Sequence, residues 1–138
     1  MADPFIHEIM VAWGDCDPAK IAYTGRIPNW CLDSINAFLH AKIGGGWFVQ
    51  ELDHDMGMPF VSMSIDFRAP VTPRHPLACE VYPSRLGETS ITFKVIGRQD
   101  GTLCFEGSFT EVFVQASTFR KQPPPERVKS VLAPLVRD

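Results

Sequence analysis

Two aspartates separated by one residue, Asp15 and Asp17, are the most informative chemical feature of the sequence. They stand in a turn-rich stretch, residues 14–20, just before a segment with helical spacing. Pro18 restrains Asp17 to extended backbone, and in an extended chain these two side chains point to opposite sides. We therefore expect the two carboxylates to have different roles, one structural and one reactive.

A helix start beside these carboxylates would add electrostatic stabilisation. The first turn of a helix has backbone N–H groups without helical partners and carries the positive end of the helix dipole. Such donors can bind the oxyanion that forms when a carbonyl is attacked, and a nearby carboxylate can attack the carbonyl or activate water. The alternative is that both aspartates only form a turn and accept hydrogen bonds from loop amides. The pattern alone favours this alternative.

Other residue groups do not form a recognisable catalytic or metal-binding pattern. Asp53, His54 and Asp55 are consecutive and cannot easily converge on one ion, so we interpret them as a solvated loop. The sequence has no nucleophile elbow and no glycine-rich loop with dinucleotide or phosphate-loop spacing. No cysteine pair has zinc-site spacing, so we expect unpaired thiols in a reducing compartment. We predict no metal and no cofactor. The four cysteines are Cys16, Cys31, Cys79 and Cys104.

Hydrophobic periodicity predicts one long helix and several strands. Three- and four-residue spacing indicates a helix over about 27–43, which the three glycines 44–46 end. Either Thr24 caps this helix or Pro28 occupies its first position. A loop containing Trp47 follows. The expected strands are 5–13, 61–67, 77–82, 91–95 and 103–114, the last entered through an Asp100-Gly101 hairpin turn, and a short final helix is expected over 126–135.

The short connections between the later strands predict antiparallel pairing, so one helix against one sheet gives an α+β fold. With 138 residues, the chain fits a single domain, 1–138. Its net charge of −3 excludes a global basic field for nucleic acid. The N-terminus lacks the pattern of a signal peptide, and no stretch has the ~18 apolar residues of a membrane span. We expect a cytoplasmic protein that binds neither nucleic acid nor membrane.

The chain resembles the 4-hydroxybenzoyl-CoA thioesterase family of the hot-dog superfamily. The residues Gly14-Asp15-Cys16-Asp17-Pro18-Ala19 match its signature. The likeness covers essentially the whole chain, although its later motifs are individually weak. These are Trp30, Leu32-Asp33, Trp47, Gly57-Met58-Pro59, Arg68-Ala69-Pro70-Val71, Arg85-Leu86-Gly87 and Arg120-Lys121.

The resemblance implies a long helix wrapped by a curved antiparallel sheet, and a homodimer or dimer of dimers with active sites at the subunit interface. Asp17 matches the catalytic carboxylate, as nucleophile or general base. The backbone amide at or near Thr24 matches the oxyanion donor, and Asp15 is a supporting residue. Lys20 stands where the family usually has Gly, which permits either positive φ or a close approach of the substrate, and Lys supplies neither easily. Lys20 either contacts an anionic part of the substrate or is solvated.

The implied reaction is hydrolysis of an acyl- or aroyl-CoA thioester to the free acid and CoA. Arg85, Arg120 and Lys121 are candidates for binding the CoA phosphates, because arginine pairs with phosphate bidentately. Ordinary surface charge explains each of them equally well. Tyr23 and Trp47 are further candidates for substrate binding. The alternatives are a non-catalytic acyl-CoA binding module and a hot-dog dehydratase, although no His follows Asp17 in the turn as a dehydratase would require.

Overall fold

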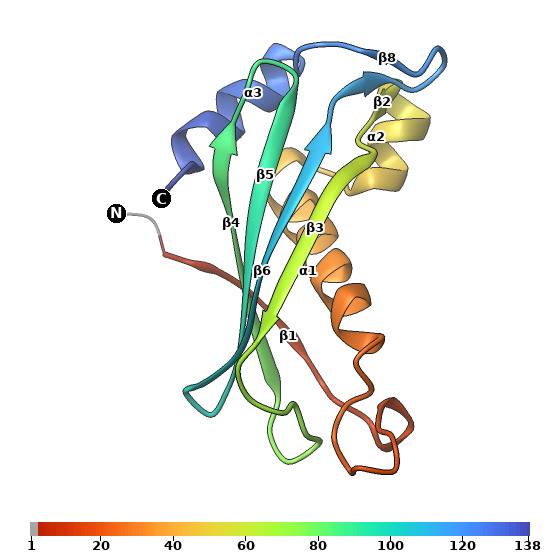
Figure 1. The fold of residues 1–138 in the computed structure, drawn as a ribbon. Coiled ribbons are helices and arrows are strands. Elements are labelled where there is room, and N and C mark those ends of the chain that lie inside the picture. The colour runs from red at the N-terminus through yellow and green to blue at the C-terminus, as the bar shows by residue number, and fades with distance from the viewer. Residues whose placement is uncertain (1–2) are drawn as a thin grey trace.

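The computed structural model describes residues 3–138, so Met1 and Ala2, which begin the segment judged not to be a signal peptide, lie outside the described residues. A curved antiparallel sheet wraps around one long helix, α1 (Figure 1). The helices are α1 (Arg26–Ile43), α2 (Trp47–His54) and α3 (Glu126–Leu132), with 3-10 turns η1 (Trp13–Asp15) and η2 (Ala133–Leu135). The strands are β1 (Phe5–Ile9), β2 (Met56–Gly57), β3 (Phe60–Phe67), β4 (Leu77–Leu86), β5 (Ser90–Gln99), β6 (Thr102–Val112), β7 (Val114–Gln115) and β8 (Arg120–Lys121).

The main sheet has the strand order β1-β4-β5-β6-β3, and each pair of neighbours is antiparallel, which confirms the prediction. A small sheet, β2-β7-β8, lies beside it. The β5–β6 hairpin turns at Asp100 and Gly101, whose φ angles are 48° and 80°. Two consecutive positive φ values are the geometry that an Asp-Gly hairpin favours, so this predicted turn is confirmed.

The core lies between α1 and the concave face of the sheet. One side of α1 is fully buried, with Cys31, Ile35 and Leu39 inaccessible to solvent. The sheet meets this side with phenylalanines, and the rings of Phe38 and Phe93 pack edge to face with centroids 5.6 Å apart. The amphipathic helix predicted from the spacing therefore forms and fills the curve of the sheet.

Several predicted elements differ from the structure, beyond β4 and β5, which end four residues later than predicted. The first strand ends at Ile9 rather than Trp13, because η1 closes a turn there and leaves Trp13 84% exposed. Helix α1 begins at Arg26 after Gly25, so neither Thr24 nor Pro28 has the expected capping position. Pro28 is instead the third helical residue, where its missing N–H has no helical partner to lose. The predicted loop at Trp47 is the helix α2.

Strand β3 is an edge of the main sheet and leaves apolar side chains uncovered. Met63 and Phe67 pair with the buried residues Phe109 and Phe105 and so share the face that packs on α1. Nevertheless, Met63 is 50% exposed and Phe67 is 54% exposed. An edge strand also presents unpaired backbone N–H and C=O groups. The β3 edge, defined here as Val61, Met63 and Phe67, is therefore an uncovered apolar surface.

Among the helices of residues 3–138, none is both long and apolar enough to cross a membrane.

Candidate functional site

Asp17 lines an open cavity at the N-terminal end of α1. The cavity volume is about 500 Å³. Arg26 and Asn29 contribute from the first turns of α1, and Tyr23 contributes from the segment before it. The structure therefore brings together two of the predicted site residues, Asp17 and Tyr23. The full lining is Gly14, Cys16, Asp17, Tyr23, Gly25, Arg26 and Asn29.

Asp17 is held by a tight turn in its own segment. Its amide donates to the carbonyl of Ile21 at 3.0 Å, and its carbonyl accepts from Lys20 at 2.9 Å. Its carboxylate oxygen Oδ1 accepts from the amide of Ala19 at 2.8 Å. Lys20 completes the turn with φ of 67°, the left-handed region. Lys20 therefore adopts the glycine-like conformation in spite of its cost to a residue with a Cβ.

Asp15 has different contacts from Asp17, although each carboxylate accepts a hydrogen bond from a loop amide, as the turn interpretation predicts. It lies in η1 rather than in extended backbone. Its Oδ2 accepts from the amide of Ala12 at 2.8 Å, and its Oδ1 lies 3.3 Å from Nε of Arg26. Its carbonyl also accepts from the amide of Tyr23 at 2.8 Å. These contacts connect the Asp17 segment to the first residue of α1.

The helix start presents two backbone donors in the segment that leads from Asp17 into α1. Within residues 3–138, neither the Thr24 amide nor the Gly25 amide donates to a protein acceptor. Gly25 lines the same cavity as Asp17, whereas Thr24 lines a neighbouring one with the end of β3. Gly25 also allows the Tyr23 ring to lie close, because a Cβ at residue 25 would sit 2.5 Å from Cε2 of that ring. The arrangement can offer hydrogen bonds to a developing oxyanion.

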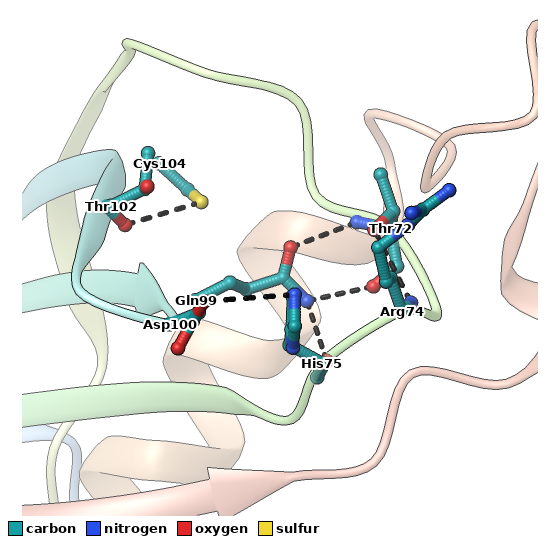
Figure 2. Close-up of polar contacts among 7 residues, drawn as sticks. All are labelled: Thr72, Arg74, His75, Gln99, Asp100, Thr102 and Cys104. Carbon is teal, nitrogen blue, oxygen red and sulfur yellow. Dashed lines mark hydrogen bonds and ion pairs between the residues drawn. The ribbon is translucent and has the colours of Figure 1, made fainter.

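Gln99, a buried residue that the sequence analysis missed, supports the Asp17 segment indirectly, through the loop that follows Val71. The amide of Ala22 donates to the carbonyl of Val71 at 2.7 Å, and the next residues are held by Gln99 at the end of β5. The side-chain amide of Gln99 accepts from the backbone N–H of Thr72 at 2.9 Å and donates to the carbonyls of Thr72 and His75, at 2.7 Å in each case (Figure 2). Gln99 thus fixes the 72–75 loop, and so holds in place the neighbouring Val71 carbonyl to which Ala22 donates. The sequence does give one indication of this role, because Gln99 is a polar residue at a position of the alternating strand where an apolar residue would be expected.

Trp47 does not lie beside Asp17 in the same chain. It is the first residue of α2 and lines a separate cavity of about 440 Å³ with Asp33, Asn36, Phe48, Glu51 and Leu52. Its indole Nε1 donates to Oε2 of Glu111 at 2.8 Å. Glu111, on β6, is fully buried and was also missed by the sequence analysis. Burial raises its pKa well above the usual range, against the opposing effect of the Trp47 hydrogen bond.

The three predicted phosphate ligands lie at the opposite end of the sheet from Asp17. Arg85 is exposed near the end of β4, and Arg120 and Lys121 form β8. Hydrogen bonds through Phe113 to Thr89 and Gln122 place these two regions side by side. The other end of β4 pairs with Ile9 of β1, close to the Asp17 segment. Ten strand residues span roughly 33 Å, so one chain does not bring these cations to its own Asp17.

The remaining titratable groups of the described residues differ in their surroundings. Within residues 3–138, no group of three His, Cys, Asp or Glu side chains is placed to hold an ion. Asp53 and His54 belong to the end of α2 rather than to the predicted loop. Asp55 accepts from the amide and hydroxyl of Ser117 at 2.7 and 2.9 Å, and these hydrogen bonds lower its pKa. The four cysteines are unpaired, and burial raises the pKa of Cys79 to about 11.

Comparison with known proteins identifies the architecture as the hot-dog fold of thioesterases. A crystal structure from the thioesterase superfamily of Jannaschia sp. CCS1 superposes with a TM-score of 0.94 at 48% identity, covering 98% of this chain and 94% of that one. A 1,4-dihydroxy-2-naphthoyl-CoA thioesterase from Synechocystis superposes with a TM-score of 0.85 at 19% identity, covering 96% and 98%. The predicted fold class is confirmed.

Residues 11–132 match the thioesterase-like superfamily, and the chain belongs to this family. A curated relative is the 1,4-dihydroxy-2-naphthoyl-CoA hydrolase of Prochlorococcus marinus (strain MIT 9313). It is 24% identical over 125 residues, which are 86% of this chain and 83% of that protein. The resemblance drawn from the Asp15–Asp17 motif is therefore confirmed at the level of the family.

Proposed function

We propose that the protein hydrolyses an acyl- or aroyl-CoA thioester to the free acid and CoA, with Asp17 as the reacting carboxylate. The observation that carries the proposal is the placement of Asp17 in an open cavity that Gly25, at the start of α1, also lines, where the Gly25 amide donates to no protein acceptor within residues 3–138. Membership of the thioesterase-like superfamily and the CoA thioesters named for its relatives support it.

The chemistry follows from this geometry in one of two ways. As a general base, Asp17 accepts a proton from water while the water oxygen attacks the thioester carbonyl. As a nucleophile, its carboxylate attacks the carbonyl directly, and water then cleaves the resulting anhydride. In both cases the C–S bond breaks, and the leaving thiolate takes up a proton. The amide of Thr24, or the next amide at Gly25, would stabilise the oxyanion on the carbonyl oxygen.

The functional unit in this proposal is a dimer formed through the β3 edge. A two-fold axis at the middle of β3 would pair the two edge strands antiparallel and cover Val61, Met63 and Phe67. Figure 1 shows α2 near the beginning of β3 and the segment before α1 at the end opposite α2. The same axis would therefore carry Trp47 of the partner subunit towards Asp17. In this dimer Tyr23 and the partner's Trp47 contact the acyl group.

The same two-fold axis would bring the end of the partner's sheet that carries the basic residues towards the Asp17 end of the first chain. This is why we retain Arg85, Arg120 and Lys121 as candidates for the CoA phosphates, even though they lie far from Asp17 within one chain. The protein is net acidic, so a CoA site must depend on such a local cluster. Asp15 remains a supporting residue, because its contacts hold the turn that contains Asp17.

The decisive experiment is Asp17→Asn, assayed on a panel of CoA thioesters with a thiol reagent. We expect kcat to fall by at least ~10², because the amide keeps the shape but can neither accept the proton nor attack. The fold should persist, since Asn retains an oxygen for the Ala19 amide. Asp15→Asn is the matched control and should cost less activity. Near-normal turnover by Asp17→Asn would exclude the mechanism, and a wild-type protein that binds the thioesters without cleaving them would favour the binding module.

A further inference from the structure

Glu111 is a buried carboxyl that the proposed hydrolysis does not use. It stands on β6 between Phe60 of β3 and Ile91 of β5, and its side chain is fully inaccessible to solvent. One carboxyl oxygen, Oε2, accepts the hydrogen bond from the Trp47 indole. The other, Oε1, has no hydrogen-bond partner within residues 3–138. Burying a carboxyl is costly unless it is hydrogen-bonded, so its retention in an apolar strand pair calls for an explanation.

The contacts of Trp47 indicate what Glu111 does. The backbone amide of Trp47 donates to Oδ1 of Asn36 on α1 at 2.8 Å. Its ring packs edge to face on Phe60, with centroids 5.4 Å apart and planes at 79°. The hydrogen bond to Glu111 is the third contact, and it holds the N–H edge of the indole. A ring fixed at its backbone, face and N–H has one orientation.

We propose that Glu111 is a positioning residue that fixes the Trp47 indole and so shapes the wall of the cavity between α1 and α2. This rests on the proposed function, in which Trp47 contacts the acyl group. The other apolar residues of that wall, Phe48 and Leu52, are exposed on α2 and have no comparable polar anchor within the described residues. Trp47 is therefore the preorganised part of the wall. Fixing one contact surface in advance lowers the entropy lost when the substrate binds.

Three variants test the role. Glu111→Met removes the acceptor while keeping an unbranched side chain of similar length, and we expect the KM for an aroyl-CoA to rise about fivefold, the equivalent of one ordinary hydrogen bond. Glu111→Gln keeps an acceptor oxygen, so its KM should stay within about twofold of wild type. In a Trp47→Phe background, Glu111→Met should have no further effect on KM, because the N–H that it serves is gone.

A second measurement does not depend on activity. The protein has three tryptophans, so a spectrum of the ¹⁵N-labelled protein should show three indole N–H signals, and Trp47→Phe identifies the relevant one. We expect Glu111→Met to move that signal and Glu111→Gln to move it less. Gln99→Met is the matched control: it removes a buried polar side chain from β5 and should leave the Trp47 signal in place.

The outcomes separate this proposal from the proposed function. An unmoved Trp47 signal in Glu111→Met, or a KM effect that adds in full to that of Trp47→Phe, would overturn the positioning role. The same holds if Glu111→Gln is as impaired as Glu111→Met, since that would mean that the acid itself is required. If the wild-type protein cleaves no thioester, the proposed function fails, while the indole measurement still decides whether Glu111 orients Trp47.

Discussion

Lys20 adopts the left-handed backbone conformation in the turn that holds Asp17, with φ of 67°. A side chain with a Cβ adopts this region at a cost of about 1 kcal/mol, which glycine avoids. We therefore expect Lys20→Gly to raise the free energy of unfolding by roughly 0.5–1 kcal/mol, as measured by urea denaturation.

Lys129→Gly is the matched control for Lys20→Gly, because Lys129 is exposed within the helix α3. There the same change should lower stability by about 1 kcal/mol. If both substitutions destabilise the protein equally, the turn at Lys20 carries no backbone strain.

The residues of the site differ in how far the sequence predicts them. Asp17 and Tyr23 are recognisable because they belong to a short local motif, and the turn brings them into one cavity. Glu111 and Gln99 act through partners far away in the chain, Trp47 and the 72–75 loop, which no local pattern reveals. Both do stand at inward positions of alternating strands, where a polar residue is unexpected. Such a residue shows that a buried partner exists but not which one.

Among the secondary-structure elements, α2 depends on its neighbour α1 for its N-terminal cap. Gly46, the residue that precedes α2, has no side chain to cap it, and Asn36 of α1 accepts the hydrogen bond from the Trp47 amide instead. We expect Asn36→Ala to lower the free energy of unfolding by about 1 kcal/mol, the usual value of a lost cap. Urea denaturation measures the change.

Asn36→Asp keeps an acceptor oxygen and should retain most of the stability lost in Asn36→Ala. Asn29→Ala, on an exposed position two turns earlier in α1, is the control for loss of an asparagine from this helix. Equal stability of Asn36→Ala and wild type would mean that α2 does not depend on the cap.

The elements predicted correctly are those with a strong periodic pattern, and the failures have physical causes. Helix α1 and the strands β4 to β6 each bury one regular face, and β3 alternates apolar with polar residues although its apolar side chains stay largely exposed, so the spacing predicts all of them. Helix α2 has only eight residues, and Phe48 and Leu52 point to solvent, so no apolar stripe facing the core marks it. The predicted first strand is too long because Val11 continues the alternation, although hydrogen bonds between Ala12 and Asp15 turn the chain.

For the whole molecule, the β3 edge predicts assembly. Val61→Glu combined with Met63→Glu places two charges on this edge, where both side chains are exposed in one chain and the fold should tolerate them. We expect light scattering to show a monomer, with kcat/KM lowered at least ~10², because the site would lose the partner's Trp47. Ile6→Glu, on the opposite edge strand β1, is the control and should leave assembly unchanged. A fully active monomer would contradict the proposed dimer.

A mixed dimer tests whether the site is shared. We expect a dimer purified with one Asp17→Asn chain and one Trp47→Ala chain to regain about half of the wild-type activity, because one of its two sites then has both residues intact. If Asp17 and Trp47 act within the same chain, both sites stay defective and no activity returns.

The loop held by Gln99 links protease sensitivity to the state of the proposed active site. Arg74 is exposed, and it lies between Thr72 and His75, whose carbonyls both accept hydrogen bonds from Gln99. For trypsin to cut after Arg74, this loop must detach from Gln99 and extend. Detachment also frees Val71, whose carbonyl accepts the hydrogen bond from Ala22 in the Asp17 segment. Cleavage at this one bond therefore reports how often the Asp17 segment opens. A ligand that orders the segment should slow the cut without ever touching Arg74.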